Sequence, residues 1–302
     1  MAKVKPWITA FRLRTLPLAF SGWLVGTTLA AGSTSVSWTV ALLTLLTAFL
    51  LQILSNLAND YGDAVSGVDS DERDGPKRMV QSGHISKKQM GSAVIVFAIL
   101  TFVLGCLLLY LAFPVDYEVA LIFLLVGLLG IVAAIKYTVG KNPYGYVGFG
   151  DFFVFLFFGV VLVFGTYYLQ VQQLDWMILL PASSIVLLSI GVLNVNNIRD
   201  IESDRASGKH SIPVRIGRRK AVIYHSFLLL GALVLTAVFT VQDFTNWVQL
   251  SFLIVIILFI KNIKAVSDRP LKELDPYLKQ MALSTLLFSI LFSLGYGLAS
   301  IF

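Results

Sequence analysis

Charge and cysteine are both scarce in this chain of 302 residues. Charged residues make up 13% of the chain, against roughly 25% in soluble domains, whereas 57% are hydrophobic and the mean hydropathy is +0.82. Cys106 is the only cysteine, which excludes an intrachain disulfide and a cysteine metal site. The composition therefore excludes an ordinary soluble domain and indicates a membrane protein.

Long apolar runs take the place of charge. Nine of them follow one another, at 16–32, 38–56, 89–113, 119–136, 152–170, 176–194, 221–241, 246–263 and 281–301. Each is about as long as the roughly 20 helical residues that cross a bilayer core. Continuous apolar runs argue against strands, and a helix satisfies all of its own backbone groups in lipid. We therefore expect an all-α membrane protein with nine transmembrane helices.

Basic residues are missing from every second loop. All 23 Lys and Arg lie in the N-terminal segment or in the stretches 57–88, 136–151, 195–220 and 261–280. The loops 33–37, 114–118, 171–175 and 242–245 contain none. Because basic loops stay in the cytoplasm, the pattern predicts a multi-pass protein of the inner cell membrane with its N-terminus cytoplasmic and its C-terminus outside. The net charge of +6 then reflects this topology, so the expected partner is the lipid bilayer and no nucleic acid is expected.

Two of the cytoplasmic loops, 57–88 and 195–220, are much longer than the external ones. Loops of that length usually carry function. Both follow a span with an acidic stretch and continue into a basic stretch before the next span. The even separation suggests one domain built as a repeat, 16–136 and 152–263, with a ninth helix added at the end.

Acidic and amide side chains recur at helical spacing in both long loops. Offsets of three and four place them on one helix face. The first set is Asn56, Asn59, Asp60 and Asp63, with Asp69 further on, and the second is Asn196, Asp200 and Asp204. Hard oxygen ligands select Mg²⁺ or Ca²⁺ over zinc, and Mg²⁺ completes its coordination with water and phosphate oxygens. The two acidic stripes therefore suit a magnesium-bound diphosphate.

Cations are interleaved with these acids. The first loop carries Arg73, Lys77 and Arg78, and the second carries Arg199, Arg205 and Lys209. Arg binds phosphate oxygens through two parallel hydrogen bonds, and Lys acts as a point charge. Acids for a metal together with bases for a phosphate favour a diphosphate ligand over a bare ion.

At these residues the sequence resembles the UbiA superfamily of intramembrane aromatic prenyltransferases, most closely its 1,4-dihydroxy-2-naphthoate polyprenyltransferase subgroup. The resemblance rests on residues 59–83 (NDYGDAVSGVDSDERDGPKRMVQSG) and 196–209 (NNIRDIESDRASGK), and is supported by 12–17 (RLRTLP) and 137–151 (YTVGKNPYGYVGFGD). It covers nearly the whole chain. Gly67 departs from the general pattern, because it stands where a third Asp would follow Asp63, and Asp69 is the next acid.

The resemblance implies an enzyme that uses Mg²⁺ to transfer a polyprenyl group from polyprenyl diphosphate to 1,4-dihydroxy-2-naphthoate. Diphosphate and CO₂ would be released and demethylmenaquinol formed, as in menaquinone biosynthesis. The implied metal ligands are Asn59, Asp63, Asp69, Asp200 and Asp204, of which Asp63, Asp200 and Asp204 are also the implied catalytic residues. The implied diphosphate-binding residues are Asn196, Lys77, Arg78, Arg199, Arg205 and Lys209, and further motif residues are Asn56, Asp60 and Tyr137.

Two alternatives stay open at this point. A prenyltransferase of the same fold could use another acceptor, such as 4-hydroxybenzoate. A transporter could also carry ionisable residues in its membrane domain, but the acids here gather at one face and the spans hold almost no charge at their centres.

Overall fold

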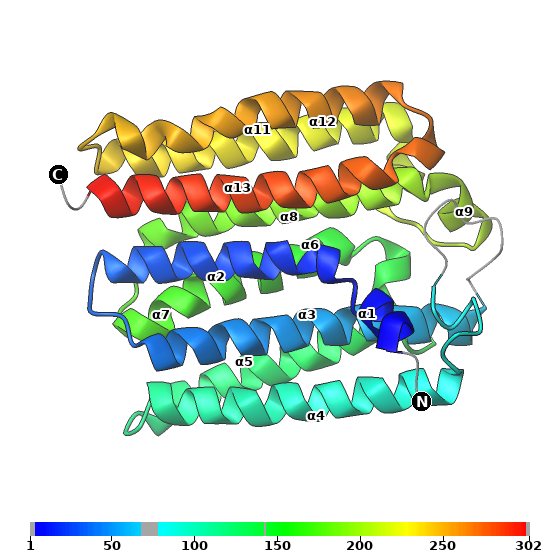
Figure 1. Cartoon of the computed structure of the whole chain (residues 1–302), viewed down its shortest axis with the longest axis horizontal. Coiled ribbons are helices and arrows are strands. Elements are labelled where there is room, and N and C mark those ends of the chain that lie inside the picture. The colour runs from blue at the N-terminus through cyan, green and yellow to red at the C-terminus, as the bar shows by residue number, and fades with distance from the viewer. Residues whose placement is uncertain (1–3, 68–77, 142, 300–302) are drawn as a thin grey trace.

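The computed structural model describes residues 4–67, 78–141 and 143–299, and within them every regular element is a helix. The long helices run along one common direction (Figure 1). The all-α fold expected from the sequence is confirmed for the described residues.

The elements follow the apolar runs of the sequence. In chain order they are α1 (Val4–Phe11), η1 (Leu13–Thr15), α2 (Leu16–Ala31), α3 (Trp38–Ser66), α4 (Lys87–Ala112), α5 (Tyr117–Lys136), η2 (Tyr144–Val147), α6 (Gly150–Val154), η3 (Phe155–Phe164), α7 (Gly165–Val171), η4 (Trp176–Ile178), α8 (Leu179–Arg199), α9 (Ile201–Ala206), α10 (Ile212–Ile216), α11 (Arg218–Gln242), η5 (Trp247–Val255), α12 (Ile256–Asp268), η6 (Leu271–Glu273) and α13 (Asp275–Ala299). The element η3 is a π-helix, and the other η elements are 3₁₀-helices.

Eight helical stretches among the described residues are long and apolar enough to cross a membrane. The first of the nine expected runs is helical too, but α2 has only 16 residues, or about 24 Å at 1.5 Å per residue. It is therefore shorter than a standard span, and the count of nine transmembrane helices stays a prediction.

Glycine lets the central helices approach closely. A Cβ added to Gly26 of α2 would lie 2.5 Å from the Val163 carbonyl oxygen of η3, and one added to Gly159 of η3 would collide with Val186 of α8. Small residues have this role in membrane bundles, where packing replaces the hydrophobic effect. The largest core accordingly joins α2, η3, α8, α11 and α13.

Both helices that carry the acidic motifs finish at the same end of the bundle. α3 and α8 run toward the end where α1 and α9 lie, and α13 finishes at the opposite end (Figure 1). α3 is continuous through the first motif and is closed by Gly67 in a left-handed conformation, with φ 72°. α8 instead ends at Arg199, and the chain turns at Asp200 into the short α9.

Candidate active site

One pocket of about 400 Å³ lies inside this bundle. One face of α3 lines it along several turns, from the first motif to the opposite half of the helix. The α3 residues that line it are Thr44, Thr47, Ala48, Leu51, Gln52, Ser55, Asn56, Asn59 and Asp63. Positions 44 to 63 span about 28 Å of helix. Side chains of α4, α5 and η3, such as Leu108, Phe123 and Phe157, line the rest of the pocket, which is therefore polar at the motif end and largely apolar beyond it.

The second motif reaches the same pocket from α8 and α9. Asn196, Asp200 and Asp204 all line it, together with Lys209. Asn197 also lines it, although its spacing had not singled it out. The pocket thus brings together side chains from two loops that are more than a hundred positions apart.

Asp63 is fully buried where cations from both loops meet. Arg78 forms an ion pair with its Oδ2, and Lys209 Nζ lies 3.3 Å from the same oxygen. The Tyr146 hydroxyl donates to the other oxygen, Oδ1, and Lys209 Nζ also lies 4.7 Å from the centre of the Tyr146 ring. Burying a carboxylate is costly unless it is paired, so these three groups make a buried Asp63 possible.

Arg78 is held in place from the α3 side. It is 8% exposed, and its Nη1 donates to the Asn59 carbonyl oxygen at 2.8 Å. Burial lowers the pKa of Arg78, and the nearby negative charges of Asp60 and Asp200 oppose that shift. Its guanidinium therefore lies between the two acidic motifs.

Arg199 binds two residues of the second motif and does not itself line the pocket. Its Nε and Nη2 donate to the two carboxylate oxygens of Asp200 at 2.7 and 2.9 Å, and Nη2 also donates to Asn196 Oδ1 at 2.9 Å. Nη1 donates to Asp275 Oδ1 at 2.5 Å, and Arg14 Nη1 binds the same carboxylate at 2.9 and 3.1 Å. We call Asp200, Arg199, Asp275 and Arg14 the charge chain, because their charges alternate in sign.

Three of the described residues that the sequence singled out do not line the pocket. Arg199 is 1% exposed, and its guanidinium is taken up by its bonds within the charge chain. Arg205 is exposed on the surface of the protein. Asp60 is 2% exposed and accepts a hydrogen bond from the Met79 backbone at 3.1 Å, which ties the following loop to α3. Asp69, Arg73 and Lys77 lie outside the described residues.

Tyr137 lines the pocket beside the first motif. Its ring packs edge-on against Tyr144, with 5.3 Å between ring centres. Burial raises the pKa of Tyr137 and of Tyr144, so both hydroxyls stay protonated at neutral pH. Tyr146, whose hydroxyl binds Asp63, was not among the predicted site residues, because tyrosine near the end of a span usually anchors it at the membrane surface.

The donor set fits a magnesium ion that shares its coordination with a phosphate. Among the described residues, no three His, Cys, Asp or Glu side chains lie together as a metal cage would need. Mg²⁺, however, takes only one or two carboxylates and completes its shell with water and phosphate oxygens. Asp63 and Asp200 line the same pocket as the amides Asn59 and Asn196, and all four offer oxygen.

Fold and site together define a multi-pass helical membrane protein. Its internal pocket has acidic and basic side chains at the motif end. The profile of the UbiA prenyltransferase family matches residues 19–296. The chain belongs to this family. It is similar to the 1,4-dihydroxy-2-naphthoate octaprenyltransferase of Escherichia coli K12, with 42% identity over 99% of this chain and 97% of that protein.

Solved structures show the same fold at low identity. A UbiA homolog from Aeropyrum pernix superposes with a TM-score of 0.67 at 17% identity, covering 98% of both chains. A UbiA homolog from Archaeoglobus fulgidus, bound to DMAPP and Mg²⁺, gives a TM-score of 0.56 at 17% identity over 93% of this chain and 98% of that one.

Proposed function

We propose that this protein transfers a polyprenyl group from polyprenyl diphosphate to 1,4-dihydroxy-2-naphthoate, with release of diphosphate and CO₂, to give demethylmenaquinol. The observation that carries the proposal is the convergence of both acidic motifs with Arg78 and Lys209 in one pocket that continues into apolar walls. The name of the Escherichia coli relative supports the choice of acceptor.

The residues at the motif end would bind the diphosphate. Asn59, Asp63, Asn196, Asp200 and Asp204 are the side chains that would hold Mg²⁺, which when bound neutralises the diphosphate and makes it a better leaving group. Asp69 remains a candidate from the sequence alone.

Cations beside these ligands would bind the phosphate oxygens directly. Arg78 and Lys209 both line the pocket, and both already contact an anionic oxygen of Asp63. Donors that are held in place before the reaction stabilise charge as it develops on a leaving group. We therefore assign the two cations to the departing diphosphate.

The transfer itself balances without an added base. The bond between prenyl C1 and oxygen breaks, and its electron pair leaves with the diphosphate. Carbon 2 of the naphthoate, which bears the carboxylate, forms the new bond to C1. The bond from carbon 2 to the carboxylate then breaks, CO₂ leaves, and its electron pair restores the aromatic ring. Because an allylic cation reacts with water, the step needs a dry pocket, and the apolar lining of α5 and η3 supplies one.

A panel of acceptors tests the substrate. Purified protein in liposomes receives one labelled polyprenyl diphosphate, together with either 1,4-dihydroxy-2-naphthoate labelled in its carboxylate or 4-hydroxybenzoate. We expect demethylmenaquinol and labelled CO₂, dependent on Mg²⁺ and abolished by a chelator. Prenylation of 4-hydroxybenzoate alone would overturn the choice of acceptor. Movement of an ion or metabolite across the membrane without any release of diphosphate would favour the transporter.

The topology follows from the charge pattern and is tested separately. We infer that the motif end faces the cytoplasm, that the chain has nine spans and that it resides in the inner membrane. Single cysteines at Ser35 and Ala206, in a Cys106→Ser background, would lie at opposite ends of the bundle, and both positions are exposed. An impermeant maleimide added to intact cells should label only Ser35→Cys, and labelling of Ala206→Cys instead would invert the topology.

A further inference from the structure

Deeper in the pocket, an amide oxygen is buried without a partner. The Gln52 side chain is 8% exposed and lines the pocket, and among the described residues its Oε1 has no hydrogen-bond partner. A buried acceptor left unpaired costs about 1–3 kcal/mol and is uncommon in native proteins. The unpaired oxygen therefore points to a ligand.

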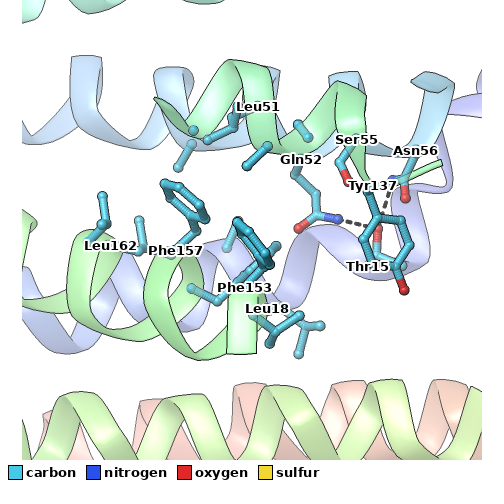
Figure 2. A pocket seen from close by; sticks show the side chains of 18 of the residues that line it. Thr15, Leu18, Leu51, Gln52, Ser55, Asn56, Tyr137, Phe153, Phe157 and Leu162 are labelled. Atoms are coloured by element: carbon cyan, nitrogen blue, oxygen red, sulfur yellow. Dashed lines mark hydrogen bonds between the residues drawn. The ribbon is translucent and has the colours of Figure 1, made fainter. Parts of the chain in front are cut away.

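The orientation of this amide is fixed by Thr15. The Thr15 hydroxyl donates its only hydrogen to the Arg12 carbonyl at 2.9 Å, so its oxygen can only accept. Asn56 Nδ2 and Gln52 Nε2 donate to that oxygen at 3.0 and 3.4 Å. A rotated Gln52 amide would place its oxygen against an acceptor. Gln52 Oε1 must therefore point away from Thr15, and Figure 2 shows it on the side of Phe153 and Phe157, which also line the pocket.

Aromatic side chains line the pocket near Gln52. Figure 2 shows the rings of Phe153 and Phe157 across from Leu51 and Gln52, and the ring of Tyr137 beside Thr15 and Asn56. Aromatic walls suit a planar ring through offset or edge-to-face contacts. The missing partner is then an O–H or N–H group carried on an aromatic ring.

The distance along α3 between Gln52 and Asp63 leaves space for the ring of an acceptor. Gln52 and Asp63 line the same pocket eleven positions apart, which is about 16 Å along the helix. A diphosphate at the Asp63 end leaves room for one ring before Gln52 is reached.

We propose that Gln52 accepts a hydrogen bond from the 4-hydroxyl group of the aromatic acceptor, an inference that rests on the proposed function. In 1,4-dihydroxy-2-naphthoate the 1-hydroxyl lies next to the carboxylate and donates to it internally. The 4-hydroxyl is the donor that remains for the protein. With that hydroxyl at Gln52, the edge that carries carbon 2 faces the motif end, where the prenyl cation forms.

The test compares two acceptors that differ only in the 4-hydroxyl, 1,4-dihydroxy-2-naphthoate and 1-hydroxy-2-naphthoate. The 4-hydroxyl is meta to carbon 2, so its removal changes the reactivity of that carbon little. The wild-type protein should prefer the dihydroxy acceptor by about ten- to a hundredfold in kcat/KM, because the site leaves Gln52 unpaired with the other acceptor. Gln52→Met, which has similar length and no acceptor oxygen, should lose this preference while KM for the prenyl diphosphate stays within about twofold of wild type.

Two further variants make the result specific. Gln52→Glu keeps an acceptor oxygen and should keep the preference. Gln170→Met is the same substitution outside the pocket, at a side chain that bonds the Ser37 backbone, and should also keep it. A wild-type protein that shows no preference, or equal ratios in wild type and Gln52→Met, would overturn the inference. So would an equal loss of preference in Gln52→Met and Gln52→Glu. Failure of the wild-type protein to prenylate either naphthoate would instead overturn the proposed function.

Discussion

The charge chain makes Asp275 a test of how the second motif is positioned. Asp275 begins α13, lies outside both motifs and has no place in the pocket lining. It nevertheless takes one hydrogen bond from Arg199, which holds both oxygens of Asp200. In Asp275→Asn the Arg199 guanidinium loses one of its two anionic partners, so its positive charge interacts more strongly with Asp200. Asp200 should then attract a divalent cation less strongly.

The contacts set the size of this effect. A hydrogen bond between charged groups contributes about 1.5–3 kcal/mol. Arg199 is 1% exposed, but the Asp275 side chain is 32% exposed, so solvent screens part of the interaction. The substituted amide also keeps one acceptor oxygen. We therefore expect a loss of about 1–2 kcal/mol, a factor of roughly 5–30 in the Mg²⁺ concentration that gives half-maximal transfer.

The assay is a Mg²⁺ titration of prenyl transfer at saturating substrates, with thermal unfolding measured in parallel. The matched control is Glu273→Gln, two positions away, where the pair with Arg269 spans 3.4 Å and both side chains are more than half exposed. That pair should contribute under about 1 kcal/mol and leave the Mg²⁺ requirement unchanged. Asp275→Glu keeps the charge and should behave more like wild type. If Asp275→Asn lowers only the melting temperature, with an unchanged Mg²⁺ requirement, the charge chain positions nothing and merely joins α13 to the N-terminal segment.

Two further predictions concern the motif carboxylates and the helix packing. Asp63→Asn and Asp200→Asn keep the side-chain shape and remove one charge each. Both should lower the transfer rate by about a hundredfold or more while the protein still inserts and elutes as a single species, and near-normal turnover in both would refute the metal assignment. Gly159→Ala should destabilise the bundle by about 1–3 kcal/mol, because the added methyl group meets Val186. Gly105→Ala, where nothing lies within 4 Å, should leave the melting temperature unchanged, and equal effects would contradict the packing argument.

Local periodicity was enough to predict the first motif. Asn56, Asn59 and Asp63 are spaced by three and four, and α3 does present all three to the pocket. Asp60 shares the spacing but lies at the edge of this face, where the Met79 backbone reaches it. Helical spacing predicts which residues share a face to within about one residue. It does not predict which other segment of the chain packs against the edge of that face. The four-span repeat and the number of spans stay predictions.

The partners of the motif residues could not be predicted in the same way. Arg14 and Asp275 are separated by 261 positions, and no spacing rule connects a pair that only the packing of α13 beside α2 brings together. Tyr146 binds Asp63 across 83 positions for the same reason. Gln52 is a polar residue within an apolar run, and only the bond of its amide to Thr15 shows which of its atoms remains for a ligand.

The cations of the two loops have a second purpose besides phosphate binding. Asp63 and Asp200 are 0% and 3% exposed, and a buried carboxylate without a partner would be strongly destabilising. Some of the interleaved bases must therefore neutralise acids so that the chain can fold. The structure divides the two purposes: Arg199 faces away from the pocket and neutralises Asp200 and Asp275, whereas Arg78 and Lys209 neutralise Asp63 from within the pocket lining. Of these three described cations, Arg78 and Lys209 are placed to exchange the Asp63 carboxylate for a phosphate oxygen, and Arg199 is not. The number of bases in the two loops therefore overstates the number available to the diphosphate.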